Sequence, residues 1–266
     1  MTRHTTTQLA TLADQLSDRD KAILADLERA RVLTGAQLQR LHFTDIDHRA
    51  QARDRRRVLQ RLATLDLVSP LQRRIGGIRA GSAGLIYALS PAARRFLALQ
   101  HGHHITKRLQ RTRTPGAPFL NHALTISEIY VALIETSRHH NFQVPTYQTE
   151  PACWHPNANH YLKPDAYTIL QTPTHQDCWW LEIDQSTESL PTITHKCHTY
   201  LNFLTHGGTG PHGTPPRILF TTPDTNRTNA IKKVITKNTT TETSQLICVT
   251  THHDAPQFLI TEVTTP

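Results

Sequence analysis

Residues 178–189 read CWWLEIDQSTES, and this stretch decides how the second half of the chain is interpreted. Its four leading apolar residues run straight into Glu182, Ile183 and Asp184, which predicts a buried strand that ends in acids. Because side chains alternate along a strand, Glu182 and Asp184 would lie on the same face. Like charges that close repel each other unless a cation lies beside them. The stretch therefore raises the question of what neutralises these two carboxylates.

The sequence around this strand predicts an α/β sheet with helices on both faces. Residues 161–172, YLKPDAYTILQT, are strand-like but contain Pro164, which indicates an edge or bulged position. A short turn, PTHQD, would join them to residues 178–184 as a hairpin. The other expected elements are helices at 121–140, 189–207 (ended by Gly207) and 225–237, and strands at 146–150, 217–222, 245–250 and 258–263.

Charge is distributed unevenly along the 266 residues. Residues 1–120 hold 21 Lys and Arg against 9 Asp and Glu, a net charge of +12. The remaining residues hold 8 against 12, a net charge of −4. A basic half joined to a mildly acidic half predicts two domains, of which the first faces a polyanion such as nucleic acid.

The basic half has the pattern of a winged helix-turn-helix domain. Three amphipathic helices are expected at residues 16–33, 34–43 and 47–68. Ser17 with Asp20 and Thr34 with Gln37 fit capping boxes. Two apolar segments around a Gly-rich, Arg-bearing tip at residues 68–90 predict a hairpin, the wing. A further helix is expected at residues 91–100.

Arginines gather on the third helix and on the predicted wing. They are candidate DNA-binding residues because arginine contacts phosphates and base edges: Arg49, Arg53, Arg56, Arg57, Arg73, Arg74 and Arg79. A single arginine on a helix is usually a solvated side chain. The run RDRRR followed by a basic hairpin favours double-stranded DNA as the partner, although winged helices also dock on proteins.

The domain boundaries follow from composition. Residues 1–100 would form the DNA-binding domain, 101–118 a basic linker, and 119–266 the α/β domain. The linker carries His101, His103 and His104, but 18 histidines across the chain indicate compositional bias and not a metal site.

Bulk features predict a cytoplasmic protein with no membrane partner. The N-terminal residues MTRHTTTQLA lack the apolar region of a signal peptide, and no apolar run approaches the length of a membrane span. The four cysteines are scattered and form no CxxC pair, which indicates reduced thiols.

The motifs KPDAY, with Pro164 and Asp165, and LEIDQ, with Glu182, resemble those of the PD-(D/E)XK nuclease-like fold. Together with the winged helix, NHALTISEIYVAL, the extended LEIDQSTES and a later Lys and Tyr, they resemble the replication-relaxation family of plasmids and mobile elements. The likeness covers roughly residues 17–205. It implies a mixed α+β and α/β chain: a winged helix followed by a nuclease-like mixed-sheet domain.

The resemblance also implies chemistry. Asp165 and Glu182 match the positions that hold Mg²⁺ or Mn²⁺ in nucleases of this fold, and Asp184 and Glu128 are further candidate ligands. The catalytic lysine of the fold would stand where this chain has Asp184. Lys196 on the next helix is the candidate substitute, with Lys163 as the alternative, and Tyr200 would follow Lys196 by one turn.

Two functions remain open at this point. In the first, the protein is a DNA-binding member of a plasmid replication, relaxation or transfer system, whose nuclease-like domain either nicks DNA with a divalent metal or serves as a degenerate scaffold. Alternatively, it is a non-enzymatic regulator or origin binder whose nuclease-like domain forms a homodimer or recruits replication or conjugation proteins. A toxin- or defence-type nuclease is a third alternative.

Overall fold

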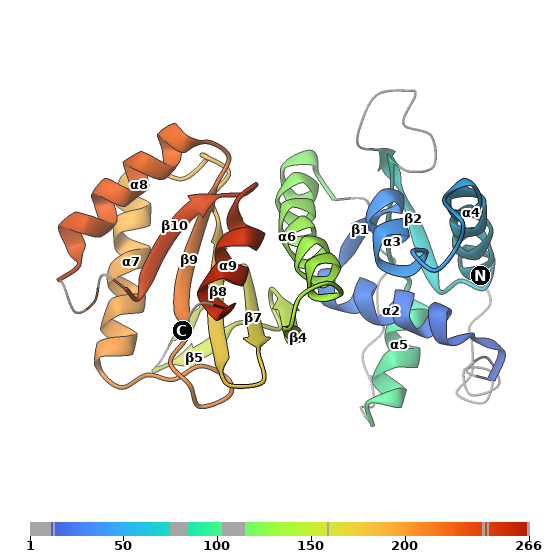
Figure 1. Cartoon of the computed structure of the whole chain (residues 1–266), viewed down its shortest axis with the longest axis horizontal. Coiled ribbons are helices and arrows are strands. Elements are labelled where there is room, and N and C mark those ends of the chain that lie inside the picture. The colour runs from blue at the N-terminus through green and yellow to red at the C-terminus, as the bar shows by residue number, and fades with distance from the viewer. Residues whose placement is uncertain are drawn as a thin grey trace. The chain divides into compact units, whose positions relative to one another are not determined.

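The computed structural model describes residues 12, 14–74, 84–102, 115–158, 160–240, 243 and 245–264, with only the backbone of 72–74. The chain divides into two compact units, Met1–Ser127 and Glu128–Pro266 (Figure 1). The division falls inside helix α6 (Ala117–Ser137). Most of the expected linker lies outside the described residues, so the predicted domain boundaries stay predictions.

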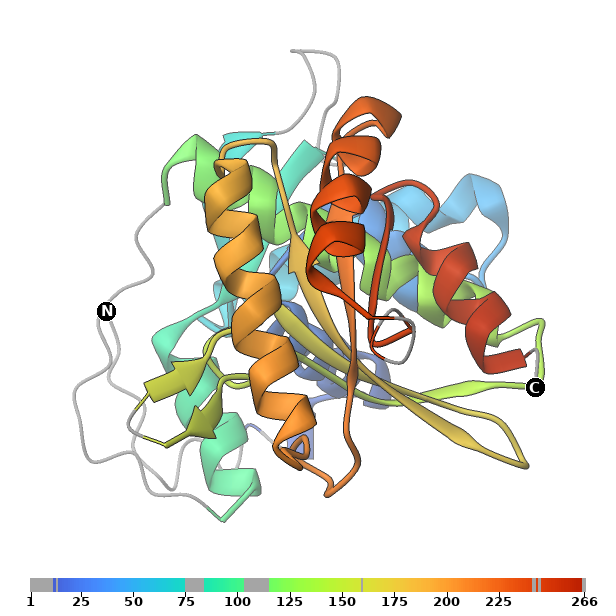
Figure 2. The same cartoon turned by 90° about the vertical axis from the view of Figure 1, so that its left-hand side faces the viewer.

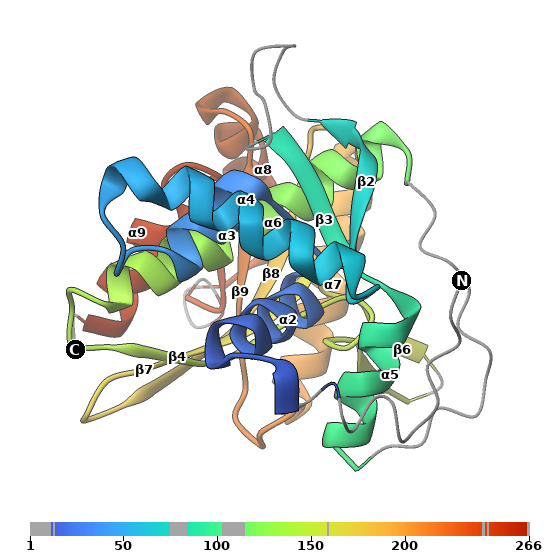
Figure 3. The same cartoon turned by 90° about the vertical axis from the view of Figure 1, so that its right-hand side faces the viewer.

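The first unit packs helices around a small antiparallel sheet with the strand order β1-β3-β2 (Figure 3). One hydrophobic cluster of its core joins the sheet to the N-terminal half of α6 and includes Ile86, Leu120 and Ala123. The remaining elements are α2 (Asp18–Ala30), β1 (Val32–Thr34), α3 (Gly35–His42), α4 (His48–Thr64), β2 (Val68–Arg74), β3 (Leu85–Leu89) and α5 (Pro91–Gln100).

The starts of α2 and α3 follow from local side-chain chemistry. The Ser17 hydroxyl accepts the amide of Asp20, and the Asp20 carboxylate accepts the amide of Ser17. Thr34 and Gln37 make the same reciprocal pair at α3. Each pair satisfies amides that have no partner inside the helix, so both predicted capping boxes are confirmed.

Helix α4 is fixed along one side. Leu59 and Leu62 are fully buried there. The buried guanidinium of Arg55 donates to Gln39 of α3 at 2.7 Å. Farther along, Arg61 donates to the buried carboxylate of Asp20 on α2 at 2.5 Å. These contacts hold the helix against two neighbours, and its opposite side faces solvent.

The second unit contains a five-stranded mixed sheet in the order β10-β9-β8-β7-β4. Strands β8, β9 and β10 run parallel, whereas β7 is antiparallel to both β8 and β4. A separate two-stranded ribbon joins β5 to β6. The elements are β4 (Gln143–Thr149), β5 (His155–Asn157), β6 (His160–Leu162), β7 (Ala166–Gln171), β8 (Gln176–Ile183), α7 (Leu190–Thr205), β9 (Arg217–Thr222), α8 (Thr225–Asn238), β10 (Ile247–Thr251) and α9 (Ala255–Thr264).

Helices cover the sheet on both faces, as the sequence predicted. Figure 2 shows α7 and α8 side by side over one face. On that side Trp180 lies in the core with Tyr200 of α7 and Ile231 of α8. The neighbouring Trp179 packs edge-on against Phe258 of α9 on the other face. Both tryptophan rings are fully buried, one to each face of β8.

The mixed α+β class is confirmed, and two local expectations are corrected. The stretch 258–263, expected as a strand, belongs to helix α9. The expected strand at 161–172 is divided at residues 163–165 into β6 and β7. Pro164 explains this break because it has no amide to donate to a strand ladder.

Helix α6 is long and apolar enough to cross a membrane by length and composition, which the sequence reasoning did not foresee. Half of its most apolar window is buried inside the protein. Helices in the core of a soluble protein can have this length and composition as well.

Candidate functional site

The acids at the end of β8 lie beside Asp165 at the start of β7. Strand β7 pairs Ala166 with Leu181, so the register brings Asp165 opposite Glu182. The Asp165 amide donates to the Leu181 carbonyl at 3.0 Å, and its carboxylate accepts the Ile183 amide at 2.7 Å. The break between β6 and β7 thus places Asp165 next to Glu182, so the two acids that were predicted to hold a metal ion lie side by side.

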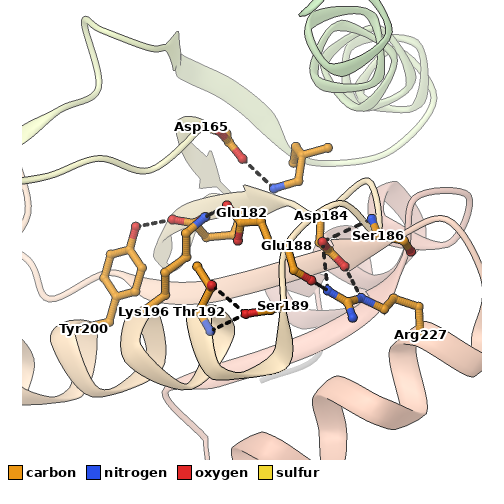
Figure 4. A network of polar contacts seen from close by, with 11 residues as sticks. Asp165, Glu182, Asp184, Ser186, Glu188, Ser189, Thr192, Lys196, Tyr200 and Arg227 are labelled. Carbon is orange, nitrogen blue, oxygen red and sulfur yellow. Dashed lines mark hydrogen bonds and ion pairs between the residues drawn. The ribbon is translucent and has the colours of Figure 1, made fainter. Parts of the chain in front are cut away.

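Helix α7 supplies two partners for Glu182 (Figure 4). The Lys196 amine donates to Glu182 Oε2 at 2.7 Å. The Tyr200 hydroxyl donates to Glu182 Oε1 at 2.5 Å. Glu182 is only 3% exposed. We call Asp165, Glu182, Lys196 and Tyr200 the Glu182 cluster.

Burial of Glu182 has an electrostatic consequence. It raises the pKa of the Glu182 carboxyl from 4.5 to about 7, because burial penalises the charged form, and the negative charge of Asp165 adds to this effect. The ammonium of Lys196 and the two hydrogen bonds lower the pKa of Glu182 without cancelling the increase. Glu182 therefore retains its proton more readily than an exposed glutamate.

The same surroundings act on Lys196, and the net change in the pKa of its amine is also upward. Burial lowers the pKa of its amine, but Glu182 and Glu188 together raise it above the ordinary value for lysine. Glu188 Oε1 lies 2.9 Å from the Lys196 Nζ. The lysine therefore stays charged and supplies the cation that the buried strand end requires.

Asp184 has a cation of its own. Arg227, in the first turn of α8, donates from Nε to Asp184 Oδ2 at 2.5 Å and from Nη2 to Oδ1 at 3.2 Å. The same Nη2 also donates to the Glu188 carbonyl at 2.6 Å. Asp184 is 4% exposed. The two carboxylates at the end of β8 therefore each have a cationic partner: Lys196 pairs with Glu182, and Arg227 pairs with Asp184.

The structure separates the two candidate lysines. Lys196 reaches the acids, whereas Lys163 lies over the ring of Trp154, 4.9 Å from its centroid. Glu128 is exposed on α6. Sequence reasoning missed Arg227, whose partner lies 43 residues away. The only sequence feature that could have indicated Arg227 is its position just after Asp224, the N-cap residue of α8, at the edge of the sheet where β9 ends.

The two carboxylates at the end of β8 are engaged by donors of the protein itself. Both oxygens of Glu182 and both of Asp184 already accept hydrogen bonds or ion pairs. In the described part of the chain no group of three or more His, Cys, Asp or Glu side chains is arranged to hold a metal ion. The predicted ligand set Asp165, Glu182, Asp184 and Glu128 stays a prediction.

The basic half offers a second candidate site. Helix α4 exposes four arginines, which we call the α4 arginine face: Arg49, Arg53, Arg56 and Arg57. The side chains of Arg53 and Arg57 are 78% and 77% exposed. Asp54 lies 3.7 Å from Arg53 and 3.3 Å from Arg57, contacts of little energetic weight at such exposure. The helix therefore carries a strong excess of positive charge on its solvent side.

The side chains of the three arginines predicted on the wing are not described by the structure. Arg73 and Arg74 belong to β2, of which only the backbone is described at these positions. Arg79 lies outside the described residues. Their part in DNA binding stays a prediction.

Comparisons with known proteins bear on both sites. A family model described as replication-relaxation matches residues 24–218. A search of curated proteins found no match. The matched range contains the α4 arginine face and all four residues of the Glu182 cluster. Because the match covers well over half of the 266 residues, this chain belongs to the replication-relaxation family.

Proposed function

We propose that this protein binds duplex DNA through the α4 arginine face during replication or relaxation of a plasmid or mobile element. Membership of the replication-relaxation family supports a role in such replication or relaxation. The observation that carries DNA binding is the exposure of four arginines on one helix whose other side is anchored. A rigid helix that presents several guanidinium groups suits the regular spacing of phosphates.

We further propose that the first unit is a winged helix. The order of α2, β1, α3, α4, β2 and β3 supports this assignment, as does the antiparallel pairing of β2 with β3. In this class of domain the last helix of the three enters the major groove. Here that helix is α4, with Arg49 and Arg53 in its N-terminal half.

Duplex affinity measured against salt tests this proposal. Neutralising four phosphates releases their counterions, so raising the salt from 50 to 200 mM should weaken binding roughly 100-fold. Fluorescence anisotropy with a labelled duplex gives the slope directly. An affinity that is indifferent to salt, or no binding at 50 mM, would contradict a phosphate-contacting function.

For the second unit we propose a nuclease-like domain that serves as a scaffold without metal-dependent cleavage. The internal pairing of Glu182 and Asp184 supports this role. A metal ion would have to compete with Lys196, Tyr200 and Arg227 for these carboxylates, and displacing one of these donors would leave a buried partner without its bond, which is costly.

One contact favours a second candidate, metal-dependent nicking. The Lys196 amine lies 2.7 Å from Glu182, so a lysine is present at the acid pair although position 184 is an aspartate. An amine in such a place can stabilise developing negative charge.

Incubation of supercoiled plasmid with Mg²⁺ or Mn²⁺ separates the two candidates. We expect no conversion to the open-circular form with either ion. Asp165→Ala serves as the matched control for contaminating nucleases. Nicking by the wild type that Asp165→Ala abolishes would establish the second candidate and refute the scaffold role.

A further inference from the structure

The β5–β6 hairpin has one buried face and one exposed face. Its register pairs His155 with Leu162 and Pro156 with Tyr161. Leu162 is buried, and the ring of His155 packs against those of Trp180 and Phe203, each at 5.7 Å. Alternation directs the residues between them to solvent. We call the exposed set the hairpin outer face: Trp154, Pro156, Tyr161 and Lys163.

The hairpin outer face concentrates exposed aromatic surface. Among the described residues three large hydrophobic side chains are exposed, and two of them, Trp154 at 36% and Tyr161 at 59%, lie here. Lys163 lies beside them with its amine 4.9 Å from the Trp154 centroid. Residues 151–163 contain no Asp or Glu. Exposed rings beside a cation form a surface that attracts flat, negatively charged ligands.

The hairpin is held firmly at its base. Cys153 is buried, and its thiol donates to the Pro164 carbonyl at 3.0 Å, which ties the chain before β5 to the chain after β6. The inner face contacts the core of the second unit through Leu162. A ligand that stacks on the outer face would therefore meet rings whose support is already ordered.

We propose that the hairpin outer face binds single-stranded DNA. Trp154 and Tyr161 would stack on unpaired bases, and Lys163 would contact the phosphates between them. Bases inside a duplex already stack on each other, so the rings select unpaired strands. This inference rests on the proposed DNA-binding function and adds a second substrate form, a single strand, to the second unit.

The place of the hairpin in the chain gives this surface a role. Lys163 ends the outer face two residues before Asp165, which opens the Glu182 cluster. A strand held on the hairpin would therefore reach the edge of the nuclease-like domain where the acids lie. Replication and relaxation both open duplexes, so the bound single strand would be the product of that opening.

Binding of a fluorescently labelled oligo(dT) tests the proposal. Trp154→Ala with Tyr161→Ala should weaken oligo(dT) binding by at least about 30-fold, because both stacking rings are lost. Trp154→Phe with Tyr161→Phe retains both rings and should bind within a few-fold of wild type. The other two tryptophans are fully buried, so oligo(dT) should quench the emission of Trp154 alone.

Duplex binding by the same variants separates this inference from the function on which it rests. The alanine variant should keep its duplex affinity, which depends on the first unit, and unchanged emission from the buried Trp179 and Trp180 would show that its second unit is folded. If the wild type does not bind duplex DNA, the proposed function is wrong. Normal duplex binding with unchanged oligo(dT) affinity in the alanine variant would overturn the hairpin proposal.

Discussion

Replacing Arg53 and Arg57 by glutamate should lower duplex DNA affinity roughly 100-fold at low salt. Both side chains are more than three-quarters exposed on α4 and have only weak contacts with Asp54. Each lost phosphate contact removes one released counterion, and each new carboxylate adds repulsion. The slope of log affinity against log salt should fall by about 2, which anisotropy titrations at several salt concentrations will measure.

A matched variant guards this result against a simple effect of net charge. Lys232→Glu with Lys233→Glu makes the same change in charge at two exposed positions of α8, in the second unit. This control should bind duplex within a few-fold of wild type. Equal losses in both variants would show that total charge, and not the α4 arginine face, drives binding.

The stability of Glu182→Gln relative to wild type should increase as the pH rises. The folded protein holds the Glu182 proton with a pKa of about 7, against 4.5 for the ordinary carboxyl. The stability that this proton contributes is fully present below pH 4.5 and is lost as the pH rises through 7. The difference corresponds to about 3 kcal/mol, which the glutamine variant avoids because it has no charge to bury.

Urea unfolding at pH 4.5, 6 and 7.5 measures this effect as the difference in free energy of unfolding between variant and wild type. Glu188→Gln is the control, since Glu188 contacts the same Lys196 amine but its side chain is 35% exposed. The control should show a smaller change with pH. A difference that stays constant from pH 4.5 to 7.5 would contradict the electrostatic account of Glu182.

The features predicted from sequence are those that depend on neighbours along the chain. The capping boxes at Ser17 and Thr34 need only a residue three positions away. The antiparallel pairing of β7 with β8 follows from the short turn between them. The stretch 258–263 was wrongly expected to be a strand, because a short apolar run does not distinguish a strand from a helix. In α9, Leu259, Ile260 and Val263 are buried at helical spacing.

The candidate site was only partly predictable because its cations come from other elements. Lys196 was a candidate since its helix follows the acid strand directly, and the amine does reach Glu182. Arg227 belongs to a helix two elements farther on, and no local pattern links it to Asp184. No pattern in the amino-acid sequence indicated that the loop before Asp165 forms a hairpin with an aromatic outer face.

The pairing of Asp184 with Arg227 also limits how this family member can evolve. A mutation that placed lysine at position 184 would set two cations against each other where little water reaches. A mutation that removed Arg227 first would leave a buried carboxylate without a counter-charge. Either single step passes through a less stable protein, so the two positions are epistatic. A lysine at position 184 would therefore require a compensating change at position 227.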